Sequence, residues 1–130
     1  MGFLDRFKSQ RDIVKEEIKE VPWVQLERME QIEELIEISK AVPVLIFKHS
    51  TSCGISRMVL KEFETDYDIE EKQLEPFFLD LKRYRDISQA IANQFEVTHE
   101  SPQVLLIKNG NSVYNSSHGA ISLEAIKKKI

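Results

Sequence analysis

The chain is short of cysteine, of net positive charge and of long apolar stretches. Its 130 residues include one cysteine, Cys53, and three histidines. One cysteine excludes an internal disulfide, and a structural zinc site would need all three histidines as further ligands. Acidic residues outnumber basic ones by 22 to 18, which argues against nucleic acid as a partner, because nucleic-acid-binding domains carry a basic stripe. No apolar run is long enough to span a membrane.

These absences favour the cytoplasm, where a free thiol stays reduced. The chain also lacks the charged and then apolar pattern of a secretory signal. Met1 and Gly2 resemble the start of a myristoylation motif, but Arg6 stands where that motif needs Ser or Thr. The length fits one domain with one core.

Two parts of the chain differ in character. Residues 1–20 are rich in charge and carry only a weak helical stripe of apolar residues, which predicts a frayed or docked N-terminal arm. A partner-binding or membrane-surface helix is the alternative, although the acidic run over residues 15–20 works against anionic lipid. Residues 21–130 are predicted to form the folded domain.

Apolar patterns in this domain alternate between strands and helices. Short continuous apolar runs predict buried strands, and apolar residues three or four apart predict amphipathic helices. Asn109-Gly110-Asn111 predicts a hairpin, and Ser122 an N-cap. The expected strands are Trp23–Leu26, Val44–Phe47, Pro76–Leu81, Val104–Ile107 and one from Val113; the expected helices are Met29–Lys40, Gly54 to about Thr65, Asp86–Phe95 and one after Ser122. This order predicts an α/β fold, a mixed sheet with helices on both faces.

Cys53 lies where the second of these strands passes through a Ser/Thr turn into a helix. A helix N-terminus stabilises a thiolate, which is the reactive form of cysteine. The alternative is a half-buried and inert cysteine, since cysteine is often buried. The loop position favours the reactive thiol.

Three local stretches carry a family resemblance across about Trp23 to Ile130. They are Val44-Leu-Ile-Phe-Lys-His-Ser-Thr-Ser-Cys-Gly-Ile-Ser56, Glu100-Ser-Pro-Gln-Val-Leu-Leu-Ile-Lys-Asn-Gly110, and the closing helix after Gly119. Together they resemble the thioredoxin superfamily, with its active-site turn, its cis-proline strand and its hairpin. The strand ending in Phe-Lys-His-Ser, followed by Cys-x-Ile-Ser, is similar to the monothiol bacilliredoxins of the bacillithiol system.

The resemblance implies a thioredoxin-like three-layer sandwich and a cytoplasmic thiol-disulfide exchange protein. Such a protein removes bacillithiol from mixed disulfides on client proteins, with bacillithiol as co-substrate and no bound cofactor. Cys53 is then the nucleophile, and Pro102 shapes the groove for the client's sulfur. The family usually has proline or a small residue after the cysteine, so Gly54 is compatible with it.

The chain also departs from the dithiol pattern of thioredoxins. Ser56 stands three residues after Cys53, where a dithiol enzyme has the second cysteine that resolves the mixed disulfide. Phe47 replaces a buried carboxylate, and Ser52 replaces a tryptophan. Cys53 can therefore form a mixed disulfide but cannot resolve it alone, so a small thiol or an external reductase must act as partner.

Several polar residues are candidates for the binding site around Cys53. The first N–H groups of the helix from Gly54, and the Ser56 hydroxyl, are expected to face the thiolate. Thr51 and Ser52 are turn formers that are also candidates for contacting a small thiol's carboxylates. A cis bond between Ser101 and Pro102 would offer the Ser101 amide to an extended ligand; a trans turn is the alternative.

The histidines allow two interpretations each. His49 is either structural or solvated, or else tunes the thiol. His99 and Glu100 are either solvated or line the groove, and His118 has a weaker claim on the ligand. Gly119 is expected to permit an unusual backbone angle or a close approach. The spacing of the histidines carries no metal-ligand motif, so no metal is expected.

One class of function competes with the exchange enzyme. A thioredoxin-fold binding or redox-sensor module would have Cys53 modified without turnover. An iron–sulfur site shared between two subunits ranks third, because the residues that would hold its small thiol are not evident.

Overall fold

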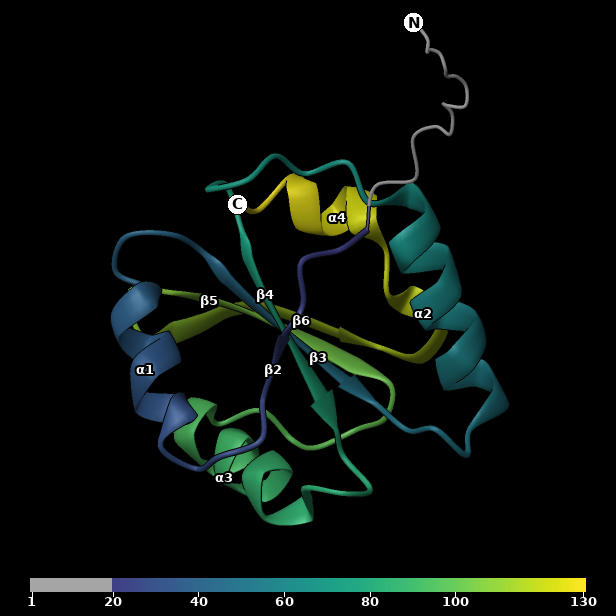
Figure 1. Ribbon diagram of the computed structural model, residues 1–130, viewed down its shortest axis with the longest axis horizontal. Coiled ribbons are helices and arrows are strands. Elements are labelled where there is room, and N and C mark those ends of the chain that lie inside the picture. The colour runs from purple at the N-terminus through teal and green to yellow at the C-terminus, as the bar shows by residue number, and fades with distance from the viewer. Residues whose placement is uncertain (1–19) are drawn as a thin grey trace, which may run out of the picture.

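The structure is a computed structural model that describes residues 20–130. The predicted N-terminal arm, apart from Glu20, lies outside the described residues. The described chain forms one five-stranded sheet with helices on both sides (Figure 1). The strands are β2 (Val24–Gln25), β3 (Val44–His49), β4 (Glu75–Asp80), β5 (Gln103–Lys108) and β6 (Asn111–Ser117); the helices are α1 (Gln31–Ile38), α2 (Gly54–Asp66), α3 (Arg85–Phe95), α4 (Leu123–Lys127) and the short 3-10 helix η1 (His118–Ala120).

The sheet is mixed, as the alternating pattern predicts. Its strand order is β2-β4-β3-β5-β6, with β4 parallel to both β2 and β3, and β5 antiparallel to both β3 and β6. The hairpin between β5 and β6 turns at Asn109 and Gly110, whose φ angles are 51° and 79°. Positive φ at both turn positions is the requirement of a type I′ hairpin. The predicted hairpin is therefore confirmed.

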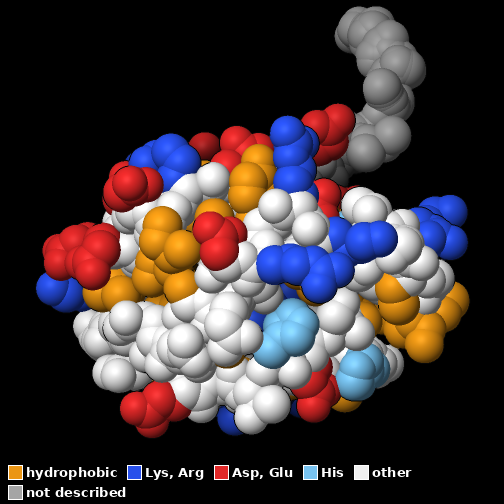
Figure 2. Space-filling model, turned by 90° about the horizontal axis from the view of Figure 1, so that it is seen from below, with side chains coloured by type: hydrophobic (Ala, Val, Ile, Leu, Met, Phe, Trp, Pro, Cys, Tyr) orange, Lys and Arg blue, Asp and Glu red, His pale blue; other side chains and the backbone are white. Residues whose placement is uncertain are grey.

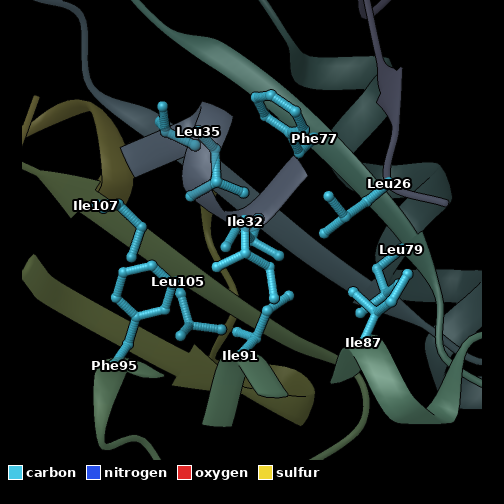
Figure 3. Packing of buried hydrophobic residues seen from close by; sticks show 12 residues of the cluster. Leu26, Ile32, Leu35, Phe77, Leu79, Ile87, Ile91, Phe95, Leu105 and Ile107 are labelled. Carbon is cyan, nitrogen blue, oxygen red and sulfur yellow. The ribbon is translucent and has the colours of Figure 1, made fainter. Parts of the chain in front are cut away.

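Strand β3 lies at the centre and separates two hydrophobic clusters. Because side chains alternate along a strand, Val44 and Ile46 face the cluster under α1 and α3, whereas Leu45 and Phe47 face the one under α2 and α4. Figure 3 shows the first cluster, in which residues of α1 and α3 meet those of β4 and β5. Burial on both faces explains why β3 reads as a continuous apolar run.

The predicted elements are present, with bounds that differ by a few residues. The N-cap at Ser122 is confirmed, because its Oγ accepts a hydrogen bond from Ala125 N at 3.3 Å. The helix η1 was not predicted. β3 continues two residues past the apolar run, and its last residues, Lys48 and His49, are both buried. Hydrogen bonds to these two side chains, described below, make that burial tolerable.

The helices of the described chain were compared with the length and hydrophobicity of a membrane span. Within residues 20–130, no helix has both the length and the apolar character that crossing a membrane would require.

Candidate functional site

Cys53 occupies the N-cap position of α2, as predicted from the strand-to-helix junction. Its backbone is extended, with φ −103° and ψ 121°, and its carbonyl accepts the first helical hydrogen bond from Arg57 N at 3.0 Å. The loop before it is closed by Cys53 N donating to Ser50 O at 3.2 Å. Cys53 is half-buried and free, and the first turn of α2 contains no acidic residue to offset the positive end of the helix dipole.

Ser56 lies under the loop rather than beside the thiol. It has no exposed surface, and its Oγ accepts from Ser50 N at 3.1 Å and lies 2.8 Å from His49 Nδ1. A hydroxyl that accepts from an amide keeps its own proton free, so the Ser56 hydroxyl can donate to His49 Nδ1 in the tautomer that carries its proton on Nε2. The expectation that Ser56 donates to Cys53 or touches substrate is therefore corrected: this hydroxyl ties the Cys53 loop to β3.

His49 is the other half of this tie. It is 5% exposed, so a solvated ring is wrong; the hydrogen bond to Ser56 favours the structural interpretation, and tuning of the thiol stays a prediction. Burial lowers the pKa of His49, and Arg57 lowers it further, while Asp80 and Glu64 oppose these effects. This effect favours a neutral ring, which can share a hydrogen bond with Ser56 in either tautomer. No hydrogen bond joins His49 to Cys53 in the described chain.

Two cationic side chains hold the turn before Cys53. Arg57 Nη1 donates to Thr51 O at 3.1 Å, and Lys82 Nζ donates to Ser52 Oγ at 3.2 Å. Neither cation is in an ion pair with a carboxylate of the described residues. Figure 2 looks onto the side of the molecule toward which β3 and β4 run, where basic side chains gather beside histidines. The surroundings of Thr51 and Ser52 are thus positive, although the chain as a whole is acidic.

The first turn of α2 is open to solvent. A Cβ at Gly54 would meet only Arg57 Nη2, at 3.9 Å, so the site does not demand glycine here. Ile55 and Met58 are 52% and 58% exposed, although both fit the helical apolar stripe. The buried side of α2 is formed by Ser56, Val59 and Phe63 instead. Apolar surface therefore adjoins the thiol.

The peptide bond between Ser101 and Pro102 is cis, as predicted. Pro102 is buried, and its carbonyl accepts from His118 N at 2.9 Å. This bond joins Pro102 to η1, which packs against α2. The Oγ of Ser101 is buried without a partner in the described residues. The structure thus connects the Pro102 turn, through η1, with the helix that begins at Cys53; their contacts with a substrate stay a prediction.

Gly119 does not have the predicted role. Its φ is not positive, and a Cβ built on it would meet nothing within 4 Å. The positive φ of 57° belongs to its neighbour, His118. The His118 side chain is exposed, and its Nδ1 lies 3.5 Å from Glu100 Oε1. The unusual backbone angle that was predicted at Gly119 therefore lies at the preceding residue, His118.

The histidines do not assemble into a metal site. His49 points to the face under α2, whereas the ring of His99 lies against α3 on the other face. The residues described contain no group of three or more side chains suited to a metal ion.

Three side chains that shape the site were not predicted as site residues. Lys48 is fully buried, and a signal for it exists: it continues the alternation of Val44 and Ile46, which places it inward. Arg57 could have been found because it follows Cys53 by four residues, one helical turn. Lys82 is 30 residues from Ser52 in the chain, and no local pattern connects them.

Comparison with solved structures places this geometry in a known fold. The chain is similar to a thioredoxin-fold protein proposed to be an oxidoreductase, with 32% sequence identity, a TM-score of 0.69, and coverage of 81% of this chain and 90% of that one. It is also similar to thioredoxin (Mala s 13) of Malassezia sympodialis, with 17% identity, a TM-score of 0.64, and coverage of 87% and 92%. Thioredoxin f2 of Chlamydomonas reinhardtii matches with 14% identity, a TM-score of 0.62, and coverage of 83% and 93%.

A family match covers most of the described chain, including Cys53 and Pro102. The sequence model of the family described as monothiol bacilliredoxin BrxC matches residues 24–126. The single thiol at the start of α2, with a buried serine three residues later, agrees with the monothiol description. The chain belongs to the monothiol bacilliredoxin BrxC family and has a thioredoxin fold.

Proposed function

We propose that this protein removes bacillithiol from mixed disulfides on client proteins in the cytoplasm, with Cys53 as the nucleophile. The observation that carries the proposal is the lone, half-buried thiol at the start of α2, with Ser56 buried in the position of a resolving cysteine. Family membership and the fold support a redox thiol function. The bacillithiol-specific step is the proposal.

The chemistry takes two exchanges. The Cys53 thiolate attacks the bacillithiol sulfur of the mixed disulfide; a new S–S bond forms to Cys53, the old one breaks, and the client leaves as a thiolate that takes a proton from water. A second thiolate, from a small thiol or an external reductase, then attacks the disulfide on Cys53. Cys53 is released as thiolate, and the small thiol leaves in a disulfide with the second thiol. No electrons are gained or lost by the protein over the cycle.

The charge around the turn supports a small thiol that carries carboxylates. Arg57 and Lys82 hold the backbone and side chain of the turn before Cys53 and have no carboxylate partner among the described residues. Cations placed in this way attract an anionic ligand. Thr51, Ser52 and the N–H groups from Gly54 onward are the proposed polar contacts, with Ser101 and Pro102 on the client's side.

The test follows both partners of the exchange. A client protein carrying bacillithiol on one cysteine is incubated with the protein, and intact masses of both are recorded over time. We expect the client to lose the bacillithiol mass while Cys53 gains it, and a Cys53→Ser variant to leave the client unchanged. A parallel client carrying glutathione tests the choice of thiol.

A redox-sensor module would give a different time course of the intact masses. Cys53 would take up the small thiol but would not release it when a second thiol is added. Absence of transfer to Cys53 would contradict the exchange proposal.

A further inference from the structure

A lysine without an acidic partner is buried beside the cis-proline turn. Lys48 has no exposed surface and lies on the face of the sheet covered by α1 and α3, between Leu79 of β4 and Gln103 of β5. Within residues 20–130, no ion pair involves it. Burying a charge without an opposite charge is costly, and burial lowers the pKa of Lys48 from 10.5 to about 8. Because burying the Lys48 ammonium costs stability, we looked for a function of this side chain in its contacts.

The Lys48 ammonium has two partners, one on α3 and one on the link between α3 and β5. Its Nζ donates to Ser88 O at 3.2 Å and lies 3.3 Å from His99 Nδ1. The hydroxyl of Ser88 also lies 3.2 Å from this Nδ1. Because an ammonium has only donors, Nδ1 must accept, and the neutral ring carries its proton on Nε2.

The electrostatics keep His99 in that form. The residue as a whole is exposed, but burial of part of the ring lowers the pKa of His99, and the Lys48 charge lowers it further against a smaller opposing effect of Glu100. His99 is therefore a neutral ring with one nitrogen occupied inside the protein. Its Nε2–H remains as a donor.

His99 belongs to the 98–102 segment, which ends in the cis bond before Pro102. The segment is held at its start by Gln103 Nε2, which donates to Thr98 O at 2.9 Å, and at its end by His118 N, which donates to Pro102 O at 2.9 Å. The bond from Lys48 to His99 is the only side-chain tie that joins this segment to β3 in the described residues, and β3 is the strand that leads to Cys53. Lys48 therefore links the two sides of the site through the sheet.

We propose that Lys48 is a positioning residue that, through His99, holds the 98–102 segment in place to receive the polypeptide of a client beside Cys53. This inference rests on the proposed function, because it assigns the segment to the client rather than to the small thiol. Lys48 does not touch the reacting sulfur atoms; it acts on the segment that orients the chain bearing them.

The first measurement observes the link itself. Nuclear magnetic resonance of ¹⁵N-labelled imidazoles should show Nδ1 of His99 as an acceptor in the wild-type protein. In a Lys48→Met variant, which keeps the chain length but removes the charge, the pKa of His99 should rise. A Lys61→Met variant is the matched control, because Lys61 is an exposed lysine of α2.

The second measurement separates positioning from chemistry by means of two substrates. One is an unstructured peptide whose single cysteine carries bacillithiol, and the other is 2-hydroxyethyl disulfide, which has no polypeptide to place on the segment. Lys48→Met should lower the rate constant for the peptide about tenfold, as expected for losing a hydrogen bond to a charged group. The rate with 2-hydroxyethyl disulfide should change less than about twofold. A His99→Gln variant, at an exposed position, should show the same selective loss even if Lys48→Met folds poorly.

The outcomes distinguish the two proposals. A wild-type protein that reacts with 2-hydroxyethyl disulfide but never with the peptide would overturn the proposed function, and the role of Lys48 with it. A wild-type protein that acts on the peptide, with variants that slow both substrates equally or neither, would overturn the role of Lys48 alone. If neutral His99 carries its proton on Nδ1, this nitrogen cannot accept from Lys48, and the role of Lys48 alone would be overturned.

Discussion

Lys48 and His49 are neighbours at the carboxyl end of β3, yet they serve opposite sides of the sheet. Both are buried, at 0% and 5% exposure. His49 points toward α2, where its Nδ1 shares a hydrogen bond with the hydroxyl of Ser56 and steadies the Cys53 loop. Lys48 points toward α3, where it reaches His99 and the segment that precedes Pro102. One strand end thus anchors both loops that frame the site.

The two anchors differ in electrostatics. The His49 tie joins neutral groups, because burial lowers the pKa of His49. The Lys48 tie carries a charge up to a pH of about 8. The His49 tie places no charge in the Cys53 loop, whereas the Lys48 tie places one beside the 98–102 segment. Because successive side chains of a strand point to opposite faces of the sheet, two adjacent polar residues can stabilise two different loops.

The largest expected effect tests whether the two faces of β3 form one cooperative unit. Phe47→Ala should lower the free energy of unfolding by about 3–5 kcal/mol, because it leaves a cavity among aromatic rings. Phe47 is fully buried, and its ring lies 5.8 Å from Trp23 and 5.5 Å from Phe63. Urea unfolding followed by circular dichroism and by tryptophan fluorescence measures the change.

Both probes should report a single shifted transition. Val113→Ala, at an exposed position of β6, serves as the control and should have little effect. Two separate transitions in Phe47→Ala would show that the faces unfold independently.

A smaller effect tests the neutral anchor. Ser56→Ala should lower the free energy of unfolding by about 1–3 kcal/mol, because Ser50 N and His49 Nδ1 are both left without their partner. The alkylation rate of Cys53 by iodoacetamide should also change, since the loop that carries it is loosened. Ser122→Ala, which removes only an exposed N-cap, controls for loss of a serine hydroxyl. Unchanged stability in Ser56→Ala would show that the hydrogen bonds of Ser56 to Ser50 and His49 do not stabilise the fold.

The charged anchor predicts a pH dependence of stability. Between the lowered pKa of Lys48, about 8, and its ordinary value of 10.5, the unfolded chain binds a proton that the folded protein does not. The contribution of this group to stability should therefore rise with pH across that window. The free energy of unfolding of the wild type minus that of Lys48→Met should increase between about pH 7.5 and about pH 9.5 in urea titrations. A difference that stays constant would mean that Lys48 is solvated.

The smallest expected effect concerns charge beside Cys53. Arg57→Gln should slow exchange with an anionic disulfide, such as that of mercaptosuccinate, which carries two carboxylates on each half, by up to about fivefold, the range of an exposed ion pair. Exchange with the neutral 2-hydroxyethyl disulfide should be unaffected. Added salt should reduce the preference of the wild type for the anionic disulfide. Equal slowing of both disulfides would assign Arg57 to the loop alone, through its bond to Thr51.

Local patterns predicted the place of Cys53 well and its surroundings less well. The strand, turn and helix around Cys53 depend on residues within a few positions of it, so periodicity was enough. Ser56 lies close to Cys53 in the sequence, but its hydroxyl is bonded by Ser50 and His49 instead. Ile55 fits the apolar spacing of α2, but it is 52% exposed among residues 20–130.

The sequence by itself determined the alternation of strands and helices, the monothiol character, and the position of the cysteine at a helix start. Each of these depends on residue type and short-range spacing, which the chain carries in itself. Only the tertiary structure decided that Lys48 meets His99, that Lys82 meets Ser52, and that His118 holds Pro102. Those contacts join residues far apart in the chain, and they depend on strand register and helix packing, which no local pattern encodes.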